Sequence, residues 1–293
     1  MKNKTFLFFA AVMFLFTVDS CQHHYPVSLV EADSLVYSNP KAALQKLDSL
    51  SLCLDTTQKA DVMYLRLLKM TVKDKLYMPF GTLDSVQSLA KYYEEEGDKH
   101  LLPRAYYMLG RMFVESEDVP SALAAYRKVL AQLEQHEDIR LRGITNAQLG
   151  EMFGRQEILS LALSFYKEAF LCDSLLADEV GMLYDMRDMG TSFDYLGMKD
   201  SANVCFRKAL TKAREVKDDD MEHELLLHLA NSYLDVNADS VAKYMFLVND
   251  FELLDRCEEG CIKGAYLQMI GRDKAADSVF TDILPQTTGA LKL

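Results

Sequence analysis

Small and aromatic residues recur along the chain at an interval of 40 positions. The segments MLGRMF (108–113), QLGEMF (148–153), DMGTSF (188–193) and HLANSY (228–233) each carry a glycine or alanine, followed three positions later by an aromatic residue. An alanine stands twelve positions after each small residue, and an aromatic residue stands sixteen positions after it. Steps of three and four residues lie on one helix face, whereas a step of twelve crosses a turn. The pattern therefore predicts a repeated helical hairpin.

The repeated small residues indicate where the two helices of each hairpin approach each other. They are Gly110, Gly150, Gly190 and Ala230 in the first helices, and Ala122, Ala162, Ala202 and Ala242 in the second helices. A glycine inside a helix costs about 1 kcal/mol relative to alanine, so close packing must compensate for it. We expect each first-helix small residue to face the alanine of its partner helix, with the aromatic residues packed on either side of this contact.

The pattern weakens toward both ends of the chain. Gly264, Ala276 and Phe280 keep the offsets of twelve and sixteen, which predicts a shorter last hairpin over 255–284. Near the start, Asn39 and Pro40 are typical of a helix cap and a first helical residue. We expect an all-α fold of six or seven hairpins over 27–285, least regular over 52–100, with a flexible tail over 286–293.

These residues resemble the tetratricopeptide repeat family over 104–250. The family pattern of Leu-Gly, Tyr, Ala and Phe is carried by Leu109, Gly110, Phe113, Ala122 and Tyr126, and the next two repeats match in the same way. The period of 40 exceeds the usual period of about 34. The resemblance implies a right-handed α-solenoid whose first helices line a concave groove for a protein or peptide partner. The segment SNPKAALQKLDSL also resembles the opening of tetratricopeptide lipoproteins and membrane regulators of the Bacteroidetes.

The amino terminus reads differently from the repeats. Two lysines precede an apolar run from Phe6 to Val18, which is short for a membrane span. The following Val-Asp-Ser-Cys resembles the lipobox of a bacterial lipoprotein, with Asp19 where a small residue is usual. We therefore expect a lipoprotein signal peptide over 1–20, an acylated Cys21 that anchors the chain to a membrane, and a tether over 21–26. An uncleaved anchor and ordinary secretion are the alternatives.

The net charge and the absence of catalytic motifs disfavour nucleic-acid binding and catalysis. Thirty-two basic against 44 acidic residues give a net charge of −12, which disfavours nucleic acid as a partner. The sequence has no GxSxG, P-loop or HExxH motif, and its six histidines are scattered. We expect no catalytic residues, no cofactor and no metal, and hence no enzyme. The acidic segment EVKDDDMEHE (215–224) is interpreted as a loop and the first turn of a helix rather than as a cation site.

The cysteines other than Cys21 are scattered along the chain. They are Cys53, Cys172, Cys205, Cys257 and Cys261. The last two stand one helical turn apart, so a strained disulfide is one interpretation. Burial as small apolar residues is the favoured interpretation.

The resemblance to tetratricopeptide repeats also places candidate partner-binding residues on the first helices. These are Tyr107, Arg111, Tyr184, Arg187 and Asn231, and the equivalent positions of the intervening repeat include Glu151 and Arg155. Thr191 belongs to the same set. Tyrosine and arginine often dominate binding energy at protein interfaces.

The favoured function is a non-catalytic scaffold for protein binding, carried by an envelope lipoprotein on the periplasmic side. One alternative is a surface lipoprotein that binds a glycan or another nutrient ligand, although the chain has no tryptophan to stack on a sugar. Another is a sensor related to the tetratricopeptide membrane regulators but without their DNA-binding part.

Overall fold

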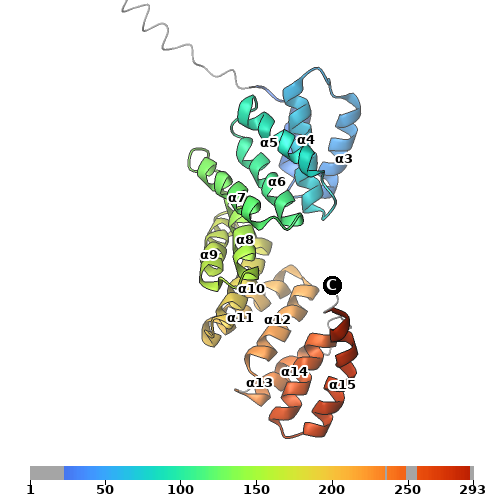
Figure 1. Ribbon diagram of the computed structural model, residues 1–293, viewed down its shortest axis with the longest axis vertical. Helices are drawn as coiled ribbons and strands as arrows, with labels where there is room; N and C mark the ends of the chain where they lie inside the picture. Colours follow the sequence, from blue (N-terminus) through green and yellow to red (C-terminus); the bar gives the residue numbers. More distant parts are fainter. Residues whose placement is uncertain (1–22, 235, 249–255, 291–293) are drawn as a thin grey trace, which may run out of the picture. The chain divides into compact units, whose positions relative to one another are not determined.

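Helices arranged as sequential pairs make up the described chain (Figure 1). The computed structural model describes residues 23–234, 236–248 and 256–290, with side chains for all of these except 256–258 and 284–290. Fourteen α-helices occur within these residues, and no strand does. The expected signal peptide over 1–20 and Cys21 lie outside the described residues. The all-α fold class predicted from the repeat is confirmed.

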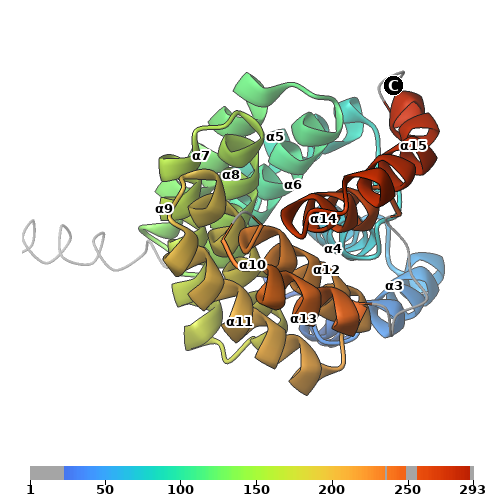
Figure 2. The same ribbon diagram turned by 90° about the horizontal axis from the view of Figure 1, so that it is seen from below.

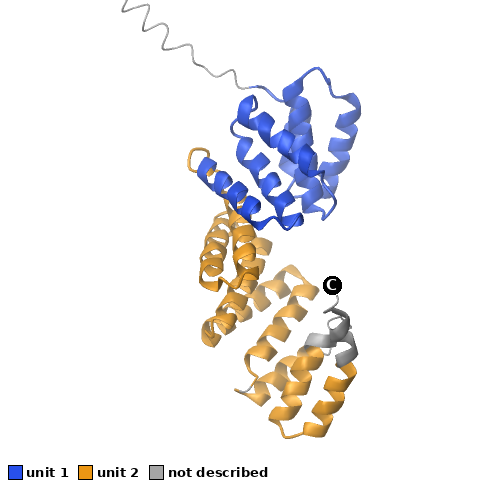
Figure 3. Ribbon diagram, in the orientation of Figure 1, with its two compact units in different colours: residues 1–132 blue, residues 133–293 orange. Residues whose placement is uncertain are grey.

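The helices form two compact units, divided between Gln132 and Leu133 (Figure 3). Unit 1 contains α2 (Val27–Leu35), α3 (Pro40–Cys53), α4 (Lys59–Lys75), α5 (Leu83–Glu95), α6 (Leu102–Glu115) and α7, which runs from Val119 to Leu133. From the sequence we expected one continuous array. Because each hairpin of a repeat protein packs mainly on its neighbours, no change of composition marks the division.

Unit 2 contains the more regular repeats. Its helices are α8 (Ile139–Arg155), α9 (Leu159–Leu175), α10 (Glu179–Tyr195), α11 (Lys199–Val216), α12 (Asp219–Ser232), α13 (Ala238–Val248), α14 (Arg256–Met269) and α15 (Asp273–Ala290). Each helix from α8 to α13 packs on the next one in the chain, and α14 packs on α15 (Figures 1 and 2). The buried side chains of α10 to α14 form one continuous apolar core.

Aspartates 40 residues apart begin three first helices of unit 2. Asp138, Asp178 and Asp218 accept hydrogen bonds from the backbone N–H three residues on, at 2.9, 3.0 and 3.0 Å. Such caps satisfy amides that have no partner inside the helix. The second carboxylate oxygen of Asp178 also accepts a hydrogen bond from Arg140 of the preceding hairpin, at 2.7 Å. The cap residue Asp178 therefore links two successive hairpins as well as starting a helix. We did not recognise the 40-residue period of these aspartates in the sequence.

The repeated glycines make room for aromatic rings. A Cβ built on each glycine would lie 2.4 to 2.7 Å from ring carbons sixteen positions on, of Tyr126 for Gly110, Tyr166 for Gly150 and Phe206 for Gly190. Cβ atoms of real side chains essentially never make contacts this short, so alanine does not fit without a shift. The alanines Ala122, Ala162 and Ala202 are fully buried, and so is Ala230. The nearest neighbour of each glycine is therefore the ring and not the alanine that we expected, because the ring stands one turn farther along the second helix and reaches across.

The fourth repeat departs from the 40-residue register. Asp118, Ile158 and Met198 precede the second helices of three hairpins at equal intervals of 40, whereas Asn237 precedes α13 after 39. Val241 and Met245 therefore occupy the buried positions, Ala242 is only partly buried, and Phe246 is 71% exposed. The sequence-based register over Ala242 and Phe246 is off by one residue, because α13 begins eight residues after the small residue Ala230, whereas the other second helices begin nine residues after theirs.

The two ends of the repeat region agree with the sequence in part. Asn39 caps α3 by accepting a hydrogen bond from the Ala42 amide, and Pro40 is the first helical residue, as predicted. Gly264 and Phe280 form the glycine and ring contact of the last hairpin. α15 runs on to Ala290, through Pro285, where we expected a tail from residue 286. A proline inside a helix removes one backbone hydrogen bond, and here the helix continues beyond it.

The residues expected to form a tether pack in part on unit 1. His23 Nε2 lies 2.6 Å from Asp61 Oδ1, and the Tyr25 ring lies 4.3 Å from that of Tyr64. Among the described residues, no helix combines the length and apolar character needed to cross a membrane.

The cysteines differ in burial. Cys172 is buried, Cys205 is half-buried, and Cys53 and Cys261 are exposed, so burial as apolar residues is wrong for the last two. Position 261 falls on the outer face of α14, where solvent replaces the core contact that we expected. The side chain of Cys257 lies outside the described residues. The acidic segment holds the first turn of α12, with Asp219, Asp220 and Glu222, as favoured, but it begins with the last two residues of α11 rather than with a loop.

Candidate functional site

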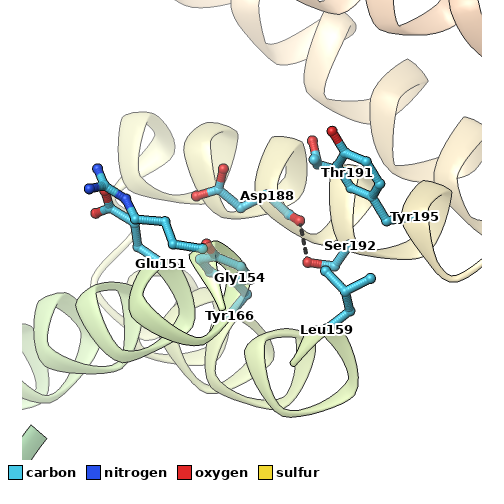
Figure 4. A pocket seen from close by; sticks show the side chains of 9 residues that line it. Glu151, Gly154, Leu159, Tyr166, Asp188, Thr191, Ser192 and Tyr195 are labelled. Atoms are coloured by element: carbon cyan, nitrogen blue, oxygen red, sulfur yellow. Dashed lines mark hydrogen bonds and ion pairs between the residues drawn. The ribbon is translucent and has the colours of Figure 1, made fainter. Parts of the chain in front are cut away.

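A hollow of about 260 Å³ lies in unit 2 between α8, α9 and α10. It is lined by Glu151, Gly154 and Arg155 of α8, Leu159 and Tyr166 of α9, and Asp188, Thr191, Ser192 and Tyr195 of α10. We call this the hollow of unit 2. Figure 4 shows Glu151 and the Asp188 carboxylate toward one end of it, and Thr191 and Tyr195 toward the other. The hollow is thus acidic at one end and aromatic at the other.

Two glycines stand one turn apart on α8 beside the Tyr166 ring. The Tyr166 ring lies in the space that a Cβ at Gly150 would need. One turn later, a Cβ at Gly154 would have the Tyr166 hydroxyl at 3.7 Å as its nearest neighbour, an ordinary contact distance. The glycine that lets the repeat pack therefore also sets the ring that forms one wall of the hollow.

Two hydroxyl groups line the hollow as hydrogen-bond acceptors. The Ser192 hydroxyl donates to the carbonyl oxygen of Asp188 at 2.9 Å, and the Thr191 hydroxyl donates to that of Arg187 at 3.0 Å. A hydroxyl carries a single donor hydrogen. Since both hydrogens are used within α10, the oxygens have only lone pairs left to offer a ligand.

Charged groups stand at the acidic end. Arg155 donates to Glu151 at 2.6 Å, and Arg187 donates through Nε to Asp188 Oδ1 at 2.7 Å. Burial raises the pKa of the Asp188 carboxyl, while the Arg187 guanidinium acts in the opposite direction. The Glu151 carboxylate adds to the rise in the pKa of Asp188. Each carboxylate of the acidic end is therefore paired with an arginine, and burial still keeps the pKa of Asp188 raised.

Arg187 also connects the hollow to the next hairpin. Its Nη1 lies 3.1 Å from Glu224 Oε1, and His228 Nε2 lies 3.6 Å from the same oxygen. The interaction with His228, and after it the Arg187 charge, lower the pKa of the Glu224 carboxyl against the effect of burial. The His228 ring stacks on Phe206 at 4.9 Å. Arg187 is therefore held from two sides.

No protein-family model and no curated protein matches the sequence. Solved structures resemble it. A Rap protein complexed with Competence and Sporulation Factor aligns with a TM-score of 0.62 at 13% identity, over 88% of this chain and 76% of that chain. NprR in complex with its cognate peptide NprX aligns with a TM-score of 0.61 at 11% identity, over 87% of this chain and 76% of that chain.

A third similar structure is a signal transduction ATPase with a tetratricopeptide repeat sensor from Pyrococcus horikoshii. It aligns with a TM-score of 0.57 at 12% identity, over 90% of this chain and 47% of that chain. The chain has a tetratricopeptide-like helical repeat fold. At these identities the similarity concerns the fold.

Within this tetratricopeptide-like fold, two predicted site residues belong to unit 1 and serve its packing. Tyr107 is 5% exposed and its ring lies 5.9 Å from that of Tyr126. Arg111 donates through Nε to Asp74 at 2.8 Å, linking α6 to α4. Both side chains are thus committed to contacts inside the unit.

The other predicted residues lie in unit 2. The Arg187 guanidinium lies over the Tyr184 ring at 5.4 Å, so the structure brings these two together. Tyr184 is 41% exposed, and its hydroxyl lies 3.5 Å from the cap residue Asp218. Asn231 is exposed on α12. Of the predicted residues in unit 2, the backbone of Arg187 accepts a hydrogen bond within the hollow, and Tyr184 and Asn231 do not line it.

Sequence reasoning placed Glu151, Arg155 and Thr191 on the groove face, and all three line the hollow. It missed Asp188 and Tyr195 of the same helix. These stand three residues before and four residues after Thr191, so the same helical spacing would have found them.

Proposed function

We propose that the chain is a non-catalytic scaffold that binds an extended segment of a partner protein, or a peptide, in the hollow of unit 2. The observation that carries the proposal is the hollow itself, which combines an exposed aromatic residue with unused hydrogen-bond acceptors. Tyr195 lies at the aromatic end of the hollow and is 76% exposed. Tyrosines are frequent anchors of protein interfaces. Two similar structures hold Competence and Sporulation Factor and the peptide NprX, which supports this use of the fold.

We propose further that an acylated Cys21 anchors this scaffold to a membrane of the cell envelope, on its periplasmic side. The support is the apolar run from Phe6 to Val18 and the lipobox-like residues that follow it. Because His23 and Tyr25 already pack on unit 1, such an anchor would hold unit 1 close to the lipid.

Binding is tested with the full chain in detergent, on an array of short random peptides and on a glycan array. Tyr195→Ala is expected to weaken peptide binding at least about tenfold, because it removes a large exposed ring. Phe246→Ala is the matched control, since Phe246 is an exposed aromatic residue of unit 2 outside the hollow. Equal peptide binding by the two variants would place the binding surface elsewhere. A glycan signal that Tyr195→Ala abolishes would favour the alternative of glycan capture.

The anchor is tested by fractionation of cells that express Cys21→Ala. We expect the variant to leave the membrane fraction without detergent and to lose the mass of the acyl groups. A variant that still requires detergent, with unchanged electrophoretic mobility, would overturn the lipoprotein assignment.

A further inference from the structure

We propose that the hollow of unit 2 selects a lysine or arginine side chain of the segment that it binds. This inference rests on the proposed function and names the chemistry recognised at the same site. Its basis is the arrangement of acceptors, carboxylates and apolar surface around the hollow.

Three oxygen atoms of the hollow can accept hydrogen bonds from a ligand. The hydroxyl hydrogens of Thr191 and Ser192 are both used within α10. Arg187 binds Oδ1 of Asp188, which leaves Oδ2 for a further donor. A ligand group that offers several N–H donors and no acceptor satisfies this set best, and lysine and arginine are the side chains of that kind.

The carboxylates at the acidic end also favour a basic ligand group. The carboxylates of Glu151 and Asp188 line this end, each paired with one arginine, Arg155 in the lining and Arg187 behind Asp188. Burial and the Glu151 carboxylate raise the pKa of Asp188 in spite of its pairing with Arg187, so a second cation near Oδ2 would favour the ionised carboxylate. An acidic ligand would instead meet two carboxylates at close range.

The remaining lining fits the stem of a long basic side chain. Leu159, Gly154 and the Tyr166 ring provide an apolar wall beside the carboxylates. Lysine and arginine bury their methylene groups along such surfaces while the charged head stays with polar partners. The volume of about 260 Å³ is small for a complete organic ligand and suits a single side chain.

Arg155 takes the place of the ligand in the free protein. Its guanidinium is paired with Glu151 at 2.6 Å, yet its side chain is 71% exposed. Exposed pairs one helical turn apart contribute little to stability. A ligand cation can therefore displace Arg155 from Glu151 at small cost.

The test uses the full chain in detergent and peptides blocked at both ends, identical except for a central lysine, arginine, norleucine or glutamate. Norleucine keeps the length of lysine without its charge. We expect the lysine and arginine peptides to bind about tenfold or more tightly than the norleucine peptide. Glu151→Gln combined with Asp188→Asn should abolish this preference.

The matched control is Glu168→Gln combined with Asp200→Asn. These residues are exposed on α9 and α11, and the change in net charge is the same. The control should keep the preference for basic peptides. An equal loss of preference in both double variants would show general attraction to an acidic protein and would overturn the inference.

Arg155→Ala supplies a second readout. If Arg155 competes with the ligand for Glu151, its removal should strengthen binding of the lysine peptide roughly twofold. Weaker binding would show that Arg155 contacts the ligand itself and would contradict the inference.

The outcomes separate this inference from the proposed function. If norleucine or glutamate peptides bind as tightly as lysine peptides, and Tyr195→Ala weakens them, the scaffold proposal stands and the basic preference is wrong. If no peptide binds, both proposals fall.

Discussion

The ring of Tyr166 lies in the space that a Cβ at Gly150 would need, with Cδ1 and Cε1 each 2.7 Å from that position. The same ring forms a wall of the hollow of unit 2. One contact between α8 and α9 thus joins the packing of the repeat to the shape of the candidate site. The stability of the repeat and the geometry of the site should therefore respond together to substitutions at this position.

Gly150→Ala should destabilise unit 2, whereas Gly154→Ala should not. At Gly150 the added methyl group must displace the Tyr166 ring, and overpacking typically costs about 1 to 3 kcal/mol. At Gly154, one turn away, the methyl group meets its nearest atom at 3.7 Å, so helix propensity should stabilise the variant by about 0.5 to 1 kcal/mol. Urea unfolding of both variants measures the difference. Equal stabilities would show that the ring moves freely.

Asp185→Asn should stabilise the protein, and increasingly so as the pH rises. Burial, and then the Asp173 carboxylate, raise the pKa of Asp185 to about 9, and Oδ2 of Asp185 has no hydrogen-bond partner. The folded chain thus keeps a proton that the unfolded chain releases near pH 4. This group favours folding fully below about pH 4, and the contribution is lost as the pH rises toward the folded pKa.

The linkage sets a slope that can be measured. The gain from Asp185→Asn should grow by up to about 1.4 kcal/mol per pH unit between about pH 5 and about pH 8. Urea unfolding at several pH values measures it, and Asp200→Asn on the exposed face of α11 is the control. Parallel stability curves for the parent and Asp185→Asn would mean that Asp185 is ionised in the folded protein.

Gly197→Ala should destabilise the turn between α10 and α11 through its backbone alone. Gly197 has φ of 74°, and no atom lies within 4 Å of its Cβ position. A side chain in this left-handed conformation costs about 1 kcal/mol or more. Glu157 holds the equivalent turn position at φ of 57°, so Glu157→Gly should be neutral or stabilising. Thermal unfolding tests both, and an unchanged midpoint for Gly197→Ala would contradict this account.

Arg187→Ala should cost stability, unlike Arg155→Ala. Removing Arg187 leaves Asp188 and Glu224 without their shared cation, and loss of such a partner typically costs about 1 to 3 kcal/mol. Arg155 forms an exposed pair, so its loss should cost no more than about 0.5 kcal/mol. Denaturant unfolding compares the two. If Arg187→Ala folds as stably as the parent but binds its partner less tightly, Arg187 is a binding residue, as its sequence position suggested.

Part of the hollow's lining was predicted from the sequence, namely the residues that occupy repeated positions on the first helices. The resemblance to tetratricopeptide repeats placed Glu151, Arg155 and Thr191 on the groove face, and all three line the hollow. Asp188 and Tyr195 share that face but were not recognised. Their spacing from Thr191 could have placed them on it, but their position beside α8 and α9 depends on how the three helices pack.

The sequence by itself determined the helices and their repeat, because caps, turns and the spacing of apolar residues act within a few residues. Asn39 and Pro40 mark the start of α3 in this way. Only the tertiary structure decided which groups meet across hairpins. Arg111 and Arg187 could each have faced a partner, but each is paired with a carboxylate 37 residues away, Asp74 and Glu224.

Phe246 is likewise exposed where the repeat predicts burial. Because α13 begins one residue earlier after the small residue than the other second helices do, its side chains are rotated by about 100° relative to the repeat. Helical periodicity fixes which side chains share a face. Packing against other hairpins fixes what that face touches.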